Sequence, residues 1–172
     1  MTKREDPFIF TSSGAKWMNV EGFPLSVFRG RYYHTIDGKG RVIFPAKLYE
    51  IFAQTYDNKM VITNWDGYLL AFPYQEWALI EEKVFQQSLI RKEVRAFQRL
   101  FMSGAVDCTF DSQRRVLLPP TLREYARLDK EIVLAGMGRS IEIWNKDMFE
   151  EELVQSSQNF EAFGKFMADL GI

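Results

Sequence analysis

One long stretch of this chain occurs twice, and that repeat constrains the fold more than any other feature. The first copy spans residues 28–50 and the second spans residues 102–124. The match continues further along, where residues 60–77 align with residues 132–149. A self-match of this length indicates a structural duplication, so we expect two intimately packed halves. Set 74 positions apart, the identical pairs include Gly30 and Gly104, Asp37 and Asp111, Arg41 and Arg115, Pro45 and Pro119, Leu48 and Leu122, and Glu50 and Glu124.

Each repeat unit predicts the same order of elements: strand, turn, strand, helix, strand, strand, helix. In the first unit, Asp37-Gly38-Lys39-Gly40 is a turn by its chemistry, because both glycines can take a positive φ. Pro45 and Pro73 are each expected at the first position of a helix. Asn64-Trp65-Asp66-Gly67 is a hairpin signal between two strands. The predicted strands cover residues 31–36, 42–44, 60–63 and 68–72, then 132–135 and 141–144 in the second unit.

Three further helical segments are expected outside these strands. Residues 91–101 have an apolar face opposite a basic one, which is typical of an amphipathic helix. Asn145 is predicted to cap a helix in the second unit. Near the C-terminus, Phe160, Phe163 and Phe166 form the apolar side of a short helix. Such a face should dock on its own chain or on a neighbour.

The repeat divides the α+β chain into five segments. They are an N-terminal extension (1–27), a first unit (28–87), a connecting helix (88–101), a second unit (102–153) and a C-terminal tail (154–172). Residues 1–26 show no periodicity, and we expect them to be disordered or absent from the native protein. Val27 stands directly before Phe28-Arg29-Gly30, as an internal GTG start codon would.

Composition excludes several classes of function. With 47% hydrophobic residues the chain can bury a core, and it has no apolar run long enough to span a membrane. Its one cysteine, Cys108, fits a reducing cytoplasm. His34 is the only histidine, so no zinc set and no cofactor are expected. Net charge is -1, so nucleic-acid binding would have to depend on local patches.

Catalytic motifs are also missing. The chain has no Gly-rich phosphate loop, no nucleophile elbow and no His/Cys/Asp set, so we do not expect an enzyme. A hydrolase on a related barrel would need a carboxylate or cysteine in a cleft, whereas Asp37, Asp111 and Cys108 lie on or beside predicted turns. We interpret His34 as a strand histidine and Cys108 as a small apolar core residue.

Positive charge is concentrated on and beside the first predicted turn. Two interpretations remain open from charge alone. Lys39 and Arg41 could neutralise phosphates and read guanine in a major groove. Alternatively, the turn is a solvated hairpin in which Arg41 pairs with Asp37. The basic residues Arg91, Arg95 and Arg99 are interpreted as a solvated helix face. Between residues 28 and 47 the cations are Arg29, Arg31, Lys39, Arg41 and Lys47, against Asp37 alone.

The chain also contains the longer motifs FRGRYYHTIDGKGRVIFPAK (28–47), DGYLLAFPYQEW (66–77), RLFMSGA (99–105) and DSQRRVLLPPTLREYARL (111–128), with EIW at 142–144. Together these motifs resemble the MraZ family of bacterial transcriptional regulators. The resemblance covers residues 28 to about 153. It implies a duplicated SpoVT-AbrB-type β-barrel of swapped hairpins, double-psi-like, with short helices and both copies in one chain. It also implies a cytoplasmic, nucleoid-associated protein without catalytic activity or cofactor.

The resemblance further implies partners and site residues. Family members form ring-like homo-oligomers and bind repeated promoter sites in double-stranded DNA of the division and cell-wall gene cluster. The implied DNA-binding residues are Arg29, Arg31, Lys39, Gly40 and Arg41, with Arg114 and Arg115 in the second loop. The alternative is an oligomeric scaffold or antitoxin-like protein-binding module with incidental DNA contact.

The second loop departs from the family pattern at one position. Arg114 stands where the family has glycine. Left-handed backbone costs a non-glycine residue about 1 kcal/mol or more. We therefore expect the second loop to bend differently from the first.

Overall fold

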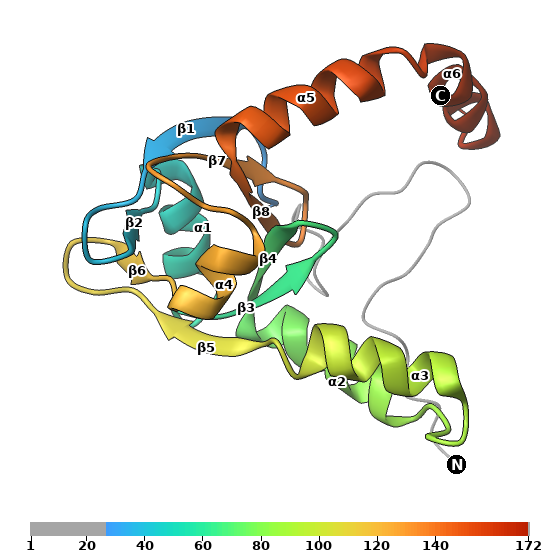
Figure 1. The fold of residues 1–172 in the computed structure, drawn as a ribbon, viewed down its shortest axis with the longest axis horizontal. Helices are drawn as coiled ribbons and strands as arrows, with labels where there is room; N and C mark the ends of the chain where they lie inside the picture. Colours follow the sequence, from blue (N-terminus) through green and yellow to red (C-terminus); the bar gives the residue numbers. More distant parts are fainter. Residues whose placement is uncertain (1–26, 172) are drawn as a thin grey trace.

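The computed structural model describes residues 27–171, so the predictions on residues 1–26 lie outside the described residues. Figure 1 shows a strand-rich body from which helices extend at one side. The first half contains β1 (Arg31–Thr35), β2 (Arg41–Ile43), α1 (Ala46–Thr55), β3 (Lys59–Trp65), β4 (Tyr68–Pro73), α2 (Tyr74–Phe85), α3 (Lys92–Phe97) and the π-helical turn η1 (Gln98–Met102). The second half contains β5 (Val106–Thr109), β6 (Arg115–Leu117), α4 (Pro120–Tyr125), β7 (Glu131–Gly136), β8 (Ile141–Asn145), α5 (Lys146–Ser157) and α6 (Phe160–Asp169).

These elements confirm the α+β class and the predicted order within each repeat unit. The hairpin at Asp66-Gly67 is confirmed, and both residues have positive φ. Asn145 caps α5 as predicted, since its Oδ1 accepts hydrogen bonds from the backbone N–H groups of Asp147 and Met148. The expected place of the prolines was wrong by one residue. Pro45 and Pro73 are N-caps with ψ near 141° and 145°, so they precede the first helical residue.

The two halves are interlocked rather than side by side. Every strand pair is antiparallel. Six strands form one sheet in the order β1-β7-β8-β4-β3-β5, and β2 and β6 form a separate two-stranded ribbon. The first strand of each unit therefore pairs with the third strand of the other, β1 with β7 and β5 with β3. Neither unit has a complete sheet of its own.

The strand registers show how closely the repeats are related. In the ribbon, Val42 pairs with Val116, which is its own equivalent in the repeat. In the sheet, Leu70 pairs with its equivalent Glu142. Each of these two pairs maps onto itself when the two repeats are exchanged. A pseudo-two-fold axis that relates the repeats must therefore pass between the two residues of each pair.

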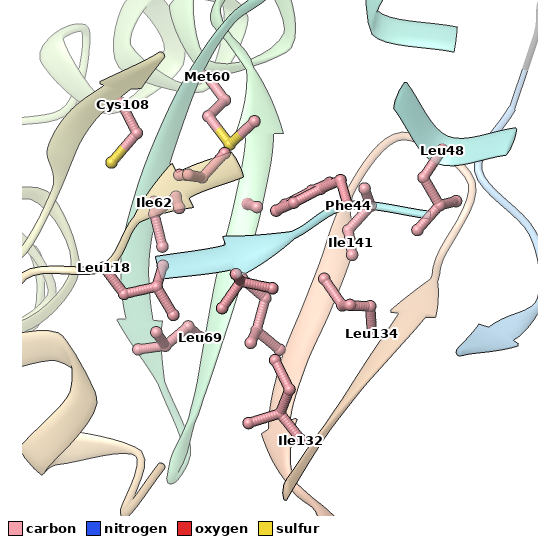
Figure 2. Close-up of a cluster of buried hydrophobic side chains, with 14 of the residues drawn as sticks. Phe44, Leu48, Met60, Ile62, Leu69, Cys108, Leu118, Ile132, Leu134 and Ile141 are labelled. Carbon is pink, nitrogen blue, oxygen red and sulfur yellow. The ribbon is translucent and has the colours of Figure 1, made fainter. Parts of the chain in front are cut away.

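One large core lies between the ribbon, the sheet and helices α1 and α4. Phe44, Leu48 and Leu118 are fully buried there against strand residues such as Ile62 and Ile141 (Figure 2). Two smaller clusters lie under the outer helices, one beneath α2 and η1 and one beneath α5. None of the helices in residues 27–171 is both long and apolar enough to cross a lipid bilayer.

Candidate nucleic-acid interface

The β2/β6 ribbon has one buried face and one exposed face, as expected for strands that cover a core. Val42 and Val116 point inward and are fully buried. The alternate positions point outward. Ile43 and Leu117 are 48% and 58% exposed. The outer face consists of Arg41, Ile43, Arg115 and Leu117.

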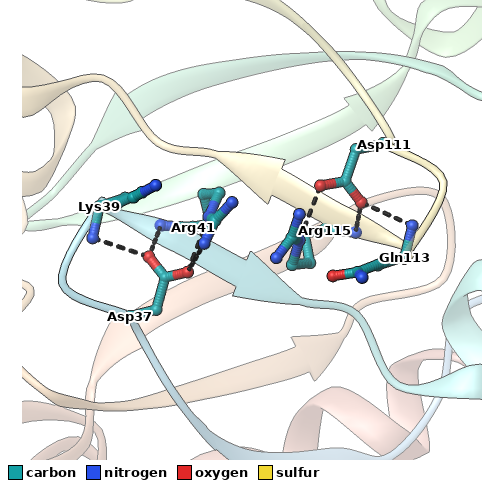
Figure 3. Close-up of polar contacts among 6 residues, drawn as sticks. All are labelled: Asp37, Lys39, Arg41, Asp111, Gln113 and Arg115. Carbon is teal, nitrogen blue, oxygen red and sulfur yellow. Dashed lines mark hydrogen bonds and ion pairs between the residues drawn. The ribbon is translucent and has the colours of Figure 1, made fainter.

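The first loop, between β1 and β2, is organised by one carboxylate. Oδ1 of Asp37 accepts hydrogen bonds from the backbone N–H groups of Lys39 (2.9 Å) and Arg41 (3.0 Å). Its Oδ2 lies 2.7 Å from both Nε and Nη2 of Arg41 (Figure 3). The predicted Asp37–Arg41 pair is therefore confirmed. It holds the guanidinium on the outer face of the ribbon and leaves its remaining N–H groups free of Asp37.

The second loop repeats this arrangement, which corrects the expectation of a different bend. Oδ1 of Asp111 accepts from the backbone N–H groups of Gln113 (2.8 Å) and Arg115 (3.0 Å), and its Oδ2 accepts from Nε of Arg115 (2.7 Å). Arg114 has φ 60°, and its equivalent Gly40 has φ 80°. The shared hydrogen bonds outweigh the cost of left-handed backbone at Arg114, so the loop keeps its shape.

Both aspartates are stabilised in their charged form. The side-chain hydrogen bond from Arg41 is the main reason that the pKa of Asp37 falls to about 2. For Asp111, desolvation raises the pKa, but the backbone and side-chain hydrogen bonds from Arg115 outweigh it and the pKa is lowered. The two aspartates therefore remain charged at neutral pH and keep both arginines in place.

Gly40 has a structural role in the first loop. It is buried, its N–H donates to the Asp37 carbonyl, and its carbonyl accepts from Leu118 N–H. A Cβ at this position would lie 2.9 Å from the guanidinium of Arg123. Both loop glycines can take a positive φ, and Gly40 does so whereas Gly38 does not.

Arg123 is a basic residue of this surface that the sequence prediction missed. Its Nε donates to the Leu118 carbonyl at 3.1 Å, which holds the guanidinium against the first loop. The two-repeat alignment carried no signal for it, because the equivalent residue is Tyr49. Lys39 and Arg114 are exposed at the two loop tips.

Two of the seven predicted site residues lie elsewhere. Arg29 and Arg31 are at the start of β1, whereas the first loop follows its end. The four strand residues that follow Arg31, at about 3.3 Å each, separate both arginines from the loop. Arg31 lies over the ring of Phe149, with its Cζ 5.9 Å from the ring centroid. The structure thus gathers Lys39, Gly40, Arg41, Arg114 and Arg115 on the ribbon and its loops, and it places Arg29 and Arg31 at the opposite end of β1.

The possible catalytic residues do not form a site. Among residues 27–171, no three His, Cys, Asp or Glu side chains are grouped as metal ligands would be. Cys108 belongs to the main core, as interpreted, and burial raises the pKa of its thiol to about 11. His34 lies in β1, as predicted, and partial burial lowers its pKa. A buried thiol of raised pKa is a poor nucleophile.

Comparison with known proteins identifies the family of this chain. The family described as "MraZ protein, putative antitoxin-like" matches twice, over residues 27–100 and 101–169. "Transcriptional regulator MraZ" of Moorella thermoacetica is 44% identical over 85% of this chain and 100% of the relative. The proteins of the same name from Syntrophobacter fumaroxidans and Pelotomaculum thermopropionicum are 40% and 41% identical, over 84% and 85% of this chain and 97% and 99% of their own lengths. These relatives are regulators and not enzymes, and the chain belongs to the MraZ family.

Proposed function

We propose that this protein is a sequence-specific DNA-binding transcriptional regulator and that the β2/β6 ribbon is its DNA-reading element. The observation that carries the proposal is the outer face of the ribbon, where two carboxylate-held arginines stand between exposed cationic loop tips. A two-stranded ribbon fits the B-DNA major groove, which is about 12 Å wide. The names of the relatives support a regulatory role.

The contacts of Arg41 suit base recognition. Nε and Nη2 face Asp37, which leaves the outer N–H groups of the guanidinium to donate. Arginine reads guanine O6 and N7 with two such parallel donors. A side chain already held in place loses less conformational entropy on binding. Arg115 has the equivalent position beside Asp111.

The loop tips suit phosphate contacts. Lys39 and Arg114 are exposed, and neither side chain makes a hydrogen bond or ion pair within residues 27–171. Cations at such positions neutralise phosphates and fix the orientation of the protein on the duplex. Arg123 adds positive charge beside the first loop.

The finer features follow from the family resemblance and belong to the same proposal. They are a SpoVT-AbrB-type swapped-hairpin barrel, a ring-like homo-oligomer, repeated promoter sites of the division and cell-wall gene cluster, and a cytoplasmic, nucleoid-associated location. The five sequence segments, from the 1–27 extension to the 154–172 tail, are kept as proposed boundaries. The exchange of strands between the two units supports the swapped-hairpin description.

The decisive experiment compares promoter affinity in Arg41→Ala and Arg91→Ala. Arg91 is an exposed arginine on the interpreted solvated helix face, away from the ribbon, so its variant is a control of equal charge change. Arg41→Ala should weaken specific binding by about 1–3 kcal/mol and relax sequence preference, whereas Arg91→Ala should bind normally. Equal affinities for the two variants, with both folded, would remove the ribbon from the DNA site.

Lys39→Ala separates phosphate contact from base reading. It should weaken binding to all sequences alike and reduce the slope of log affinity against log salt by about one. An antitoxin-like or scaffold module, which the family description keeps as the second candidate, predicts no preference for the promoter over unrelated DNA. Measuring both duplexes across a salt series distinguishes the two candidates.

A further inference from the structure

The outer sheet face of the second unit contains an open groove of about 740 Å³ beside α5. Its floor belongs to β7 and β8 and one wall belongs to α5. The lining residues that matter below are Ala135, Met137, Glu142, Trp144, Phe149 and Glu152. Trp144 and Phe149 are buried at its base, with ring centroids 5.8 Å apart.

In the first unit the equivalent face is covered by η1. Phe101 of η1 is buried, and its ring lies 5.5 Å from Trp65 and 5.4 Å from Trp77. Phe97, directly before η1, stacks on Phe101 at 4.9 Å. Thr63 donates its hydroxyl hydrogen bond to the Phe101 carbonyl. Leu70, Phe72 and Ile80 complete the surroundings of this aromatic cluster.

The two sites are equivalent in the repeat. The residues that surround η1 in the first unit are Thr63, Trp65, Leu70, Phe72, Trp77 and Ile80. In the second repeat, 72 positions later, their equivalents are the six groove residues Ala135, Met137, Glu142, Trp144, Phe149 and Glu152, in that order. The groove is therefore the uncovered counterpart of the η1 site.

Helix α6 carries a second version of the sequence that covers the first site. Residues 96–102 read AFQRLFM, and residues 162–167 read AFGKFM. The longer version includes a π-helical turn, which accommodates one extra residue in a helix. The shorter version lies in the regular helix α6. When the extra residue of the π-helical turn is left out of the alignment, Phe163, Phe166 and Met167 correspond to Phe97, Phe101 and Met102.

The apolar side of α6 is uncovered in the single chain. Phe163 and Phe166 are 43% and 62% exposed, and Met167 is 46% exposed. Among the described residues, no α6 side chain belongs to a core cluster. In Figure 1, α6 lies at the far end of α5, away from the strands.

We propose that α6 of a second copy of this chain docks in the groove, with Phe163, Phe166 and Met167 in the places that Phe97, Phe101 and Met102 take in the first unit. The length of the connections favours a second copy. The six residues 86–91 join α2 to α3 and allow α3 to turn back along α2. The connection between α5 and α6 is shorter, since only Gln158 and Asn159 join them. Because the donor helix and the groove are different surfaces, each copy can donate α6 to one neighbour and accept α6 from another, and such head-to-tail contacts form a ring where the rotation between copies closes.

Charge at the groove fits this occupant. Glu142 and Glu152 replace the Leu70 and Ile80 of the first unit, so the second site is more acidic. Lys165 lies between the aromatic residues of α6. A lysine brought to this rim gains carboxylate neighbours, although an exposed pair of this kind contributes little stability.

The test uses the full chain without DNA, so its result is independent of the proposed regulatory function. Phe163→Glu should convert the wild-type oligomer into smaller species in light scattering, with association weakened at least about 30-fold, the loss expected for an interface anchor. Ala168→Glu is the matched control, since it adds the same charge to an exposed position of the same helix, on the side away from Phe163, Phe166 and Met167. It should leave the oligomer intact.

Met137→Glu tests the groove from the other side, and Met137 is exposed in the single chain. Each variant alone should fail to assemble. A mixture of Phe163→Glu and Met137→Glu chains should form a discrete one-to-one dimer, because one intact α6 and one intact groove remain between them. Unchanged assembly in both variants would overturn the proposal. So would a wild-type monomer at every concentration, or a mixture that forms no dimer.

Discussion

Substitutions at Gly40 and Arg114 provide a quantitative test of the loop geometry. These residues occupy equivalent positions in the first and second loops, with φ 80° and 60° and equivalent hydrogen bonds. We predict that Gly40→Ala destabilises the protein and that Arg114→Gly leaves it equally or more stable. Arg114→Ala should be nearly neutral, because the backbone angle remains and only an exposed side chain is lost.

The magnitudes follow from three contributions. Left-handed backbone costs an L-residue about 1–2 kcal/mol. In Gly40→Ala the new Cβ also displaces Arg123, whose 3.1 Å hydrogen bond to Leu118 is worth about 1 kcal/mol. The reduced freedom of the unfolded chain returns about 0.4–1 kcal/mol, so the net loss is about 1–2.6 kcal/mol. Arg114→Gly relieves the backbone cost but adds about 0.5–1 kcal/mol of unfolded-state entropy, for a net gain of up to about 1.5 kcal/mol.

Urea unfolding and calorimetry at equal protein concentrations would measure these differences, since association affects apparent stability. For a chain of this size, 1 kcal/mol shifts Tm by about 2–4 °C. The predicted cost of left-handed backbone at these positions would be contradicted if Gly40→Ala is neutral, or if Arg114→Gly destabilises the protein by as much as Gly40→Ala does.

Two further predictions concern ionisable groups. Asp37 has a folded pKa of about 2, below its usual unfolded value near 3.9, so its contribution to stability is present above pH 4 and is lost as pH falls toward 2. Asp37→Asn should therefore flatten the pH dependence of urea unfolding between about pH 4 and pH 2. An unchanged dependence in this window would contradict the assignment. Cys108 is buried, and the pKa of its thiol is raised to about 11. A disulfide reagent at pH 8 should therefore label Cys108 only as fast as the protein unfolds locally. Rapid labelling of the folded protein would show instead that the thiol is accessible.

Part of the fold could be predicted because local signals mark the elements of each repeat unit. The Asp-Gly hairpin, the Asn145 cap and the order of strands and helices along each unit all follow from local chemistry. The pairing of β1 with β7 could not be derived from periodicity, because alternation indicates a strand but does not identify its partner. The proline positions were displaced by one residue, since ψ near 141° at Pro45 places it before the helix.

The site was less predictable than the fold. Sequence reasoning identified the Asp37–Arg41 pair as one of two interpretations, and the structure shows how pairing and DNA reading can coexist on one guanidinium. It overestimated the effect of Arg114, because the cost of one backbone angle is smaller than that of losing the hydrogen bonds around Asp111. Arg123 was missed because its place against Gly40 arises only from the tertiary fold.

The exchange of strands between the halves also determines when the protein can fold during synthesis. β1 ends at residue 35, and its partner β7 begins at residue 131. At a translation rate of about 5–20 residues per second, β1 waits on the order of 5–20 seconds before β7 has been made. During that interval its edge is unpaired, and an unpaired strand edge is open to wrong partners. The nascent first half therefore has a reason to be shielded on the ribosome until most of the chain has emerged.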